Sequence, residues 1–145
     1  MTVKQISVFL ENKPGKLMEF VKLLQDHNVD MRALSLAEAP DFGVLRVIVD
    51  DPDKAQAVLK ESGSISSVTP VLAAKIADKP GGLCEILEIL QEGDVNVEYT
   101  YAFTARKNEG ACMVLRVSDA VIDKAVELLN KKGISLIDQK DIYHI

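Results

Sequence analysis

One short phrase occurs twice in the chain, and this repeat constrains the fold more than any other feature of the sequence. Residues 12–17 read NKPGKL, and residues 78–83 read DKPGGL, 66 positions later. From each phrase onward, apolar residues follow the i, i+3, i+4, i+7 spacing of an amphipathic helix. They are Leu17, Phe20, Val21 and Leu24 in the first copy, and Leu83, Ile86, Leu87 and Leu90 in the second. Self-similarity at a fixed offset indicates two copies of one structural unit.

Further along the chain the offset between the copies changes from 66 to 70. VLRV at 44–47 matches VLRV at 114–117, and the later tripeptide DKA also recurs 70 positions on. The second copy therefore carries four extra residues. We place them in the polar loop from Thr104 to Ala111, because hairpin tips tolerate insertions.

Each copy reads as strand, helix, strand, strand, helix, strand. In the first copy apolar residues alternate over 3–10, a Pro-Gly turn follows, and an amphipathic helix runs to about Asn28. A hairpin with arms near 29–38 and 44–50 precedes the second helix. This order predicts an α+β fold of two ferredoxin-like βαββαβ units, each an antiparallel sheet with helices on one face.

Two domains follow from the repeat, residues 1–69 and residues 70–145. Residues typical of helix ends frame the second helix of each domain: Asp51 and Asp119 are the expected N-caps, and Gly63 and Gly133 the expected C-terminal stops. The C-terminal tail, DIYHI, aligns with the opening strand of the second copy. We therefore expect it to add a strand that pairs with the first half.

The composition narrows the classes of function. A chain that is 48% hydrophobic and 27% charged is globular, and no apolar run reaches the roughly 20 residues that span a bilayer. The N-terminus reads as a strand and not as a signal peptide, so a soluble, cytoplasmic protein is expected. A net charge of −5 argues against nucleic acid or an anionic membrane as partner, because both require clustered Lys and Arg.

Residues that could carry catalysis are few, and we expect no catalytic residue, cofactor or metal site. His27 and His144 are expected to be capping or solvated. The two cysteines, Cys84 and Cys112, lack metal-ligand spacing and are expected to be reduced and largely buried. Cys84 falls in the first turn of a helix, where the dipole can lower a thiol's pKa. Its counterpart in the first copy is Met18, which favours a packing role.

Three aromatic residues, Tyr99, Tyr101 and Phe103, alternate on one face of a predicted strand. Stacking on RNA bases is one interpretation of such a row. The acidic composition provides nothing to neutralise phosphates, so we favour the alternative that they fill the core face of the sheet.

The repeated phrase has a functional interpretation. Proline fixes φ and glycine leaves no side chain above the backbone, so the helix N-terminus that follows is open. The N–H groups of residues 15–17 and 81–83 could then receive a carboxylate, aided by the helix dipole. Asn12 and Asp78 precede the turns and could accept hydrogen bonds from an ammonium group. Together these groups describe a site for a free α-amino acid. The structural alternative is that Asn12 and Asp78 merely cap well-made turns.

The turn phrase, the helix, the following HNVDM or GDVNV and the hairpin together resemble the ACT domain family, small regulatory modules that bind amino acids and other metabolites. The resemblance covers nearly the whole chain twice, with no catalytic domain attached. It implies side-by-side pairing of ACT units into a continuous sheet, which is compatible with a homodimer, and a ligand held between one unit's turn and the facing strand of another. The site residues carried over are Asn12, Pro14, Gly15, Lys16, Leu17 and Asp30 in the first copy, and Asp78, Pro80, Gly81, Gly82, Leu83 and Asn96 in the second.

The expected function is therefore that of a regulatory sensor that binds an amino acid and has no catalysis of its own. Gly82 stands where the first copy has Lys16, so the two sites need not bind the same ligand. An alternative is an interaction or regulatory subunit of an amino-acid biosynthetic enzyme, without its own ligand. A more distant one is a small enzyme that uses Cys84.

Overall fold

The computed structural model describes residues 1–104 and 110–144, and it divides into two compact units. The first unit is Lys4–Thr69. The second unit is Pro70–Ile145 together with Met1–Val3. The division falls inside one strand, between Thr69 and Pro70. No helix within the described ranges is long and apolar enough to cross a membrane.

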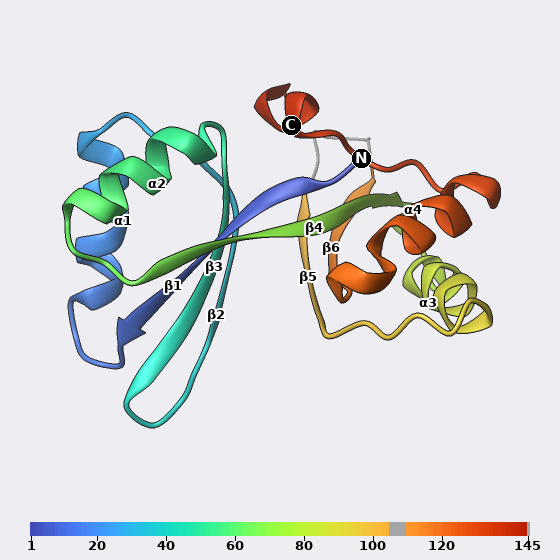
Figure 1. Cartoon of the computed structure of the whole chain (residues 1–145), viewed down its shortest axis with the longest axis horizontal. Helices are drawn as coiled ribbons and strands as arrows, with labels where there is room; N and C mark the ends of the chain where they lie inside the picture. The colour runs from blue at the N-terminus through green and yellow to red at the C-terminus, as the bar shows by residue number, and fades with distance from the viewer. Residues whose placement is uncertain (105–109, 145) are drawn as a thin grey trace. The chain divides into compact units, whose positions relative to one another are not determined.

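The first unit has the βαββαβ order and lays its helices on one face of an antiparallel sheet (Figure 1). Its strands lie in the order β2-β3-β1, and the first residues of β4 follow beside β1. Its elements are β1 (Val3–Glu11), α1 (Lys16–Asp26), β2 (Met31–Ala37), β3 (Phe42–Val49), α2 (Pro52–Glu61) and the start of β4 (Ser66–Ile76).

The core of the first unit lies between that sheet and its two helices. Alternate residues of β1, such as Ile6 and Val8, point to the same side as Leu45 and Val47 of β3 and meet Leu24 of α1. The alternation that predicted the strand is therefore the pattern that fills this core.

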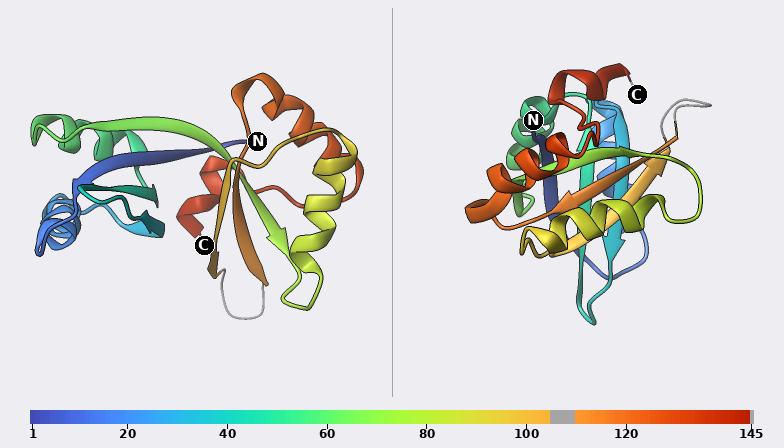
Figure 2. Two further views of the ribbon diagram at one scale, coloured as in Figure 1. Left: turned by 90° about the horizontal axis from the view of Figure 1, so that it is seen from below. Right: turned by 90° about the vertical axis from the view of Figure 1, so that its right-hand side faces the viewer.

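The second unit repeats the arrangement, with α3 and α4 on one side of its strands (Figure 2). Its strands lie in the order β4-β6-β5. Its elements are the rest of β4, α3 (Gly82–Glu92), β5 (Tyr99–Thr104), β6 (Ala111–Arg116), the short 3-10 helix η1 (Asp119–Val121), α4 (Ile122–Lys131) and a second 3-10 helix, η2 (Gln139–His144). The final strand is reduced to one antiparallel bridge between Leu136 and Ala74. The prediction of an α+β fold with two ferredoxin-like units is confirmed.

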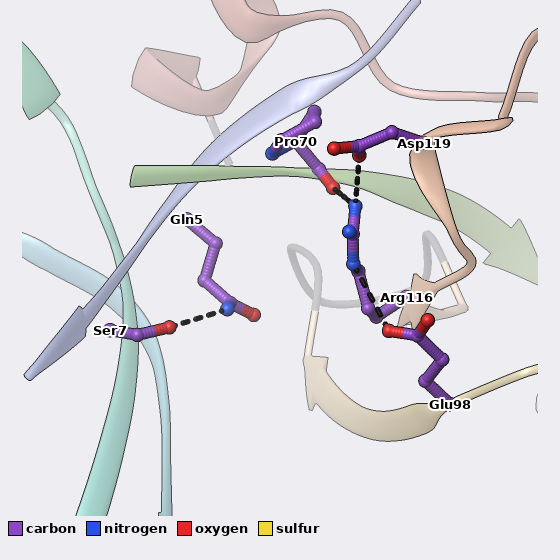
Figure 3. Close-up of polar contacts among 6 residues, drawn as sticks. All are labelled: Gln5, Ser7, Pro70, Glu98, Arg116 and Asp119. Carbon is purple, nitrogen blue, oxygen red and sulfur yellow. Dashed lines mark hydrogen bonds and ion pairs between the residues drawn. The ribbon is translucent and has the colours of Figure 1, made fainter. Parts of the chain in front are cut away.

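Helix ends follow the sequence signals with one exception. The Asp51 carboxylate accepts a hydrogen bond from the Lys54 N–H at 3.0 Å and caps α2, while Gly63 and Gly133 have positive φ at the ends of α2 and α4. The prediction that Asp119 caps the corresponding helix is wrong. Its carboxylate instead accepts a hydrogen bond from the Arg116 guanidinium at 2.7 Å (Figure 3), because η1 separates it from α4.

The pairing register corrects the position of the four extra residues. In the first hairpin Ala37 pairs with Val44 and encloses residues 38–43, whereas in the second Phe103 pairs with Cys112 and encloses residues 104–111. The second hairpin is thus longer by two residues, not four. The other two lie between β6 and α4, where η1 forms. Residues 105–109 of the predicted insertion lie outside the described residues.

The expected added strand at the C-terminus is wrong. Asp141 to His144 belong to the 3-10 helix η2, in which the Asp141 N–H donates to the Asp138 carbonyl at 2.9 Å. Ile142 is fully buried there. Local i to i+3 hydrogen bonds replace the partner strand that the alignment suggested.

The expected place of the aromatic row is also wrong. Ala102 of β5 pairs with Met113, which packs in the core under α3 and α4, so the neighbouring Tyr101 and Phe103 point to the opposite face of the sheet. Tyr99, Tyr101 and Phe103 are half-buried on that face. The alternating pattern correctly predicts that the three aromatic residues share one face of the strand. It does not indicate which face of the sheet the helices cover.

Candidate functional site

The repeated turn has nearly the same backbone in both units. Gly15 has φ 86° and Gly81 has φ 89°, and each is the residue directly before the helix. This left-handed conformation strains any residue with a Cβ, which explains the glycine. The fixed φ of the preceding Pro14 or Pro80 suits the turn, and its missing N–H leaves no donor unsatisfied.

Each turn leaves part of a helix N-terminus open. In the first unit the Lys16 N–H donates to the Lys13 carbonyl at 3.3 Å, so this group is used inside the turn. Within the described part of the chain, the N–H groups of Gly15, Leu17 and Met18 have no hydrogen-bond partner. These are the groups that the helix dipole makes receptive to an anion.

The second turn follows the same scheme. The Gly82 N–H donates to the Lys79 carbonyl at 3.1 Å, and the N–H groups of Gly81, Leu83 and Cys84 have no partner among residues 1–104 and 110–144. One of the three N–H groups expected to be open is thus engaged in each turn.

Asn12 and Asp78 do not cap the helices. Neither α1 nor α3 has a side-chain cap hydrogen bond. The Asn12 Nδ2 group instead donates to the Ala39 carbonyl at 3.3 Å, and its backbone N–H donates to the Asp41 carbonyl at 3.0 Å. These two bonds tie the turn to the hairpin between β2 and β3. The donor role of Nδ2 leaves the Asn12 Oδ1 atom as an acceptor. Asp78 is exposed.

A small cleft of about 90 Å³ opens between the first turn and that hairpin. Its wall includes Asn12 and Leu17, two of the residues that the sequence predicted. Its full lining is Leu10, Glu11, Asn12, Lys13, Leu17, Leu36, Glu38 and Gly43. Sequence reasoning missed Leu36, Glu38 and Gly43, because only strand pairing brings them to the turn.

The two acidic side chains of this cleft differ. Glu11 forms an ion pair with Lys13 at 2.7 Å, which lowers the pKa of its carboxyl and raises the pKa of the Lys13 ammonium. Glu38 has no ion pair or hydrogen bond with another described residue. Its carboxylate is therefore available to a ligand, and a cationic group is the ligand it suits.

Asp30 and Asn96 lie at the other end of the helix from the turn of their own unit. Asp30 pairs with Arg32 at 3.3 Å, and its backbone N–H donates to the Asp50 carboxylate at 2.9 Å. Asn96 is exposed just after the end of α3. Eleven residues of helix span about 16 Å, so within one unit neither residue joins the turn.

The remaining candidate side chains have structural partners. Cys112 is buried, but Cys84 is exposed, which corrects the expectation that both are largely buried. A hydrogen bond to Glu88 raises the pKa of the Cys84 thiol. His27 Nδ1 lies 2.8 Å from the Leu23 carbonyl at the end of α1, consistent with the expected capping role. Among the described residues, no group of three or more His, Cys, Asp or Glu is placed to hold a metal ion.

Comparison with protein-family models decides the family. The model of the ACT domain pair matches residues 1–145. The chain belongs to the ACT domain pair family. The resemblance stated from the repeated turn is thus confirmed.

Solved structures support the same fold for this ACT domain pair. Protein BT0572 from Bacteroides thetaiotaomicron is 39% identical, with a TM-score of 0.91 over 100% of this chain and 98% of that one. The regulatory subunit of aspartate kinase from Thermus thermophilus matches with a TM-score of 0.64 at 12% identity, covering 90% of this chain and 91% of that one. That from Thermus flavus matches with a TM-score of 0.60 at 10% identity, covering 88% and 90%. The search of curated proteins found no match.

Proposed function

We propose that this ACT domain pair is a regulatory sensor that binds a free α-amino acid at the repeated turns and acts on another protein. The observation that carries the proposal is the unused hydrogen-bonding capacity of each turn. The N–H groups of Leu17 and Leu83 have no hydrogen-bond partner among the described residues, and the nearby side chains of Asn12 and Asp78 do not cap the helices. A carboxylate and an ammonium group on one carbon atom would satisfy both kinds of group.

Ligand-induced stabilisation tests the proposal directly. An amino acid at about 100 times its Kd would stabilise the native state by about 2.7 kcal/mol, because the unfolded chain has no site. Each kcal/mol raises Tm by about 2 to 4 °C for a chain of this size. A thermal-shift screen of the twenty amino acids with the full chain should therefore give at least one shift of several degrees.

Variants of the turn residues test which groups of the protein contact the amino acid. Asn12→Ala and Asp78→Ala should each weaken the response through the lost ammonium contact, and the double variant shows whether one site or both respond. The amide of the active amino acid should fail, because the turn N–H groups receive the carboxylate. Asp123→Ala, an exposed aspartate on α4, is the matched control. A screen without any shift, or a shift that both turn variants leave intact, would refute the sensor proposal.

A second candidate is an interaction or regulatory subunit of an amino-acid metabolic enzyme, without a ligand of its own. The edge strand β2 favours it, because Leu34 and Leu36 are 48% and 46% exposed there. An unpaired edge with exposed leucines is a template for association. This candidate predicts that no amino acid raises Tm and that Leu34→Asp abolishes binding to the partner enzyme.

A further inference from the structure

Part of the wall of the first unit's cleft is formed by leucines, and we call this apolar part its floor, which a ligand's side chain would meet. Three leucines reach it from three different elements: Leu10 from β1, Leu17 from α1 and Leu36 from β2. The whole cleft, polar wall residues included, has a volume of about 90 Å³. In so small a cleft the leucines accommodate a short aliphatic side chain better than an aromatic ring.

Gly43 of β3 sets how Leu36 lies in this cleft. A Cβ atom added at Gly43 would stand 2.9 Å from the Leu36 Cδ1 atom, closer than real contacts allow. Leu36 thus uses the space that glycine leaves free. Any side chain at position 43 would push Leu36 and change the room in the cleft.

The other side chains of the cleft wall include polar ones, here called its rim, and these suit the constant part of an amino acid. The Glu38 carboxylate has no partner among the described residues, and Glu11 is already paired with Lys13. Glu38 and the Asn12 Oδ1 atom can accept from an ammonium group, and the open N–H of Leu17 can donate to a carboxylate. The polar rim and apolar floor have the chemistry of an aliphatic amino acid.

The second unit differs at the floor. By the pairing register, Ala102 and Ala111 take the positions of Leu36 and Gly43. Two of the residues that shape the first cleft are therefore replaced, and a preference read from the first cleft applies to the first unit alone.

We propose that the first unit selects a free α-amino acid with a short aliphatic side chain, such as valine, leucine or isoleucine, and that Leu36 determines this specificity. This inference rests on the proposed function and names the ligand class of its first site. One methylene gained or lost in an apolar pocket changes discrimination about 10- to 200-fold.

The test measures Kd values by calorimetry on the full chain carrying Asp78→Ala, so that the first unit is the site observed. We expect valine, leucine or isoleucine to bind at least about 10-fold more tightly than glycine, phenylalanine, aspartate and lysine. Leu36→Ala should enlarge the floor, weaken the aliphatic ligand about 10-fold or more and improve the relative affinity of phenylalanine. Leu34→Ala is the matched control, because Leu34 lies on the same strand with similar exposure but outside the cleft.

The outcomes separate the two proposals. If no amino acid binds the wild-type chain, the proposed function fails and this inference fails with it. If an amino acid binds but is charged or aromatic, or if Leu36→Ala and Leu34→Ala leave the same ranking, the sensor stands and the aliphatic assignment is overturned. Binding of valine, leucine or isoleucine that survives Asn12→Ala in the Asp78→Ala chain would also overturn it, because the ligand would then lie elsewhere.

Discussion

At the residue scale, Cys84 shows two opposing influences on one thiol. It lies in the first turn of α3, where the helix dipole favours the thiolate, and its Sγ atom lies 3.5 Å from the Glu88 carboxylate one turn later. The hydrogen bond and the negative charge of Glu88 raise the pKa of the Cys84 thiol. The Glu88 carboxylate therefore opposes the effect of the dipole and reduces the thiolate fraction of Cys84.

This balance predicts slow alkylation of Cys84. A raised pKa reduces the thiolate fraction at pH 7 to 8, and the thiolate is the reactive form. Glu88→Gln removes the charge, so the labelling rate with iodoacetamide at pH 7.5 should increase several-fold, and the pH at which labelling is half-maximal should fall. Mass spectrometry measures the rate, with buried Cys112 as the internal control that stays unlabelled in the folded chain. Equal rates in both proteins would contradict the role of Glu88.

At the scale of one element, the turn into the first helix of each unit tolerates different residues at one position. A Cβ atom added at Gly82 would lie 2.4 Å from the Ala77 carbonyl oxygen, which is backbone and cannot move aside easily. Lys16, its counterpart, is half-exposed and forms an ion pair with Glu19 at 3.1 Å. The glycine in the second turn is thus required by packing, which explains the difference without reference to a ligand.

A pair of substitutions tests this interpretation. Gly82→Ala should reduce the free energy of unfolding by about 1 to 3 kcal/mol, because the added methyl group overpacks the turn. Lys16→Ala at the equivalent position should change it by no more than about 0.5 kcal/mol, as is usual for an exposed surface site. Urea denaturation followed by circular dichroism gives both values. Similar losses for the two variants would show that the close approach to Ala77 is not what selects glycine.

At the scale of the whole molecule, the boundary between residues 1–69 and 70–145 remains our proposal for the two domains. Arg116 holds the first residue of the second domain: its guanidinium donates to the Pro70 carbonyl at 3.0 Å and pairs with Asp119 and Glu98 (Figure 3). The Arg116 side chain is only 12% exposed. Replacing it leaves two carboxylates and a carbonyl without this donor.

Arg116→Ala should therefore destabilise the second unit by about 2 kcal/mol, the scale of hydrogen bonds to a charged group. The chain has no tryptophan, and all three of its tyrosines, at positions 99, 101 and 143, lie in this unit. Tyrosine fluorescence therefore follows the unfolding of the second unit alone. In the variant, the fluorescence transition in urea should precede the transition seen by circular dichroism, which follows both units.

Lys131→Ala is the control for that measurement, because its ion pair with Glu127 is exposed and contributes little to stability. Coincident fluorescence and circular dichroism transitions in Arg116→Ala would mean that the two proposed domains unfold as one unit.

The sequence by itself determined the repeat, the order of the helices and strands up to α4 and the place of the turns. Helical and strand periodicities, the turns at Gly15 and Gly81 and the capping by Asp51 depend on neighbours a few residues away, so the sequence predicts them locally. The family followed from the same local pattern, because the turn phrase and the helix after it lie next to each other in the chain.

The features that depend on strand pairing, or on which face of the sheet the helices cover, were decided only by the tertiary structure. It divided the four extra residues between the hairpin and η1, turned Tyr101 away from the helices and brought Leu36, Glu38 and Gly43 to the first turn. The match between the two VLRV segments could not reveal that β6 is displaced by two residues from the position that this match implies. A slip of two residues keeps every side chain on its face of the sheet and leaves the hydrophobic pattern unchanged. The lining of the cleft comes from residues up to 33 positions apart, from Leu10 to Gly43, and such contacts arise only when the sheet forms.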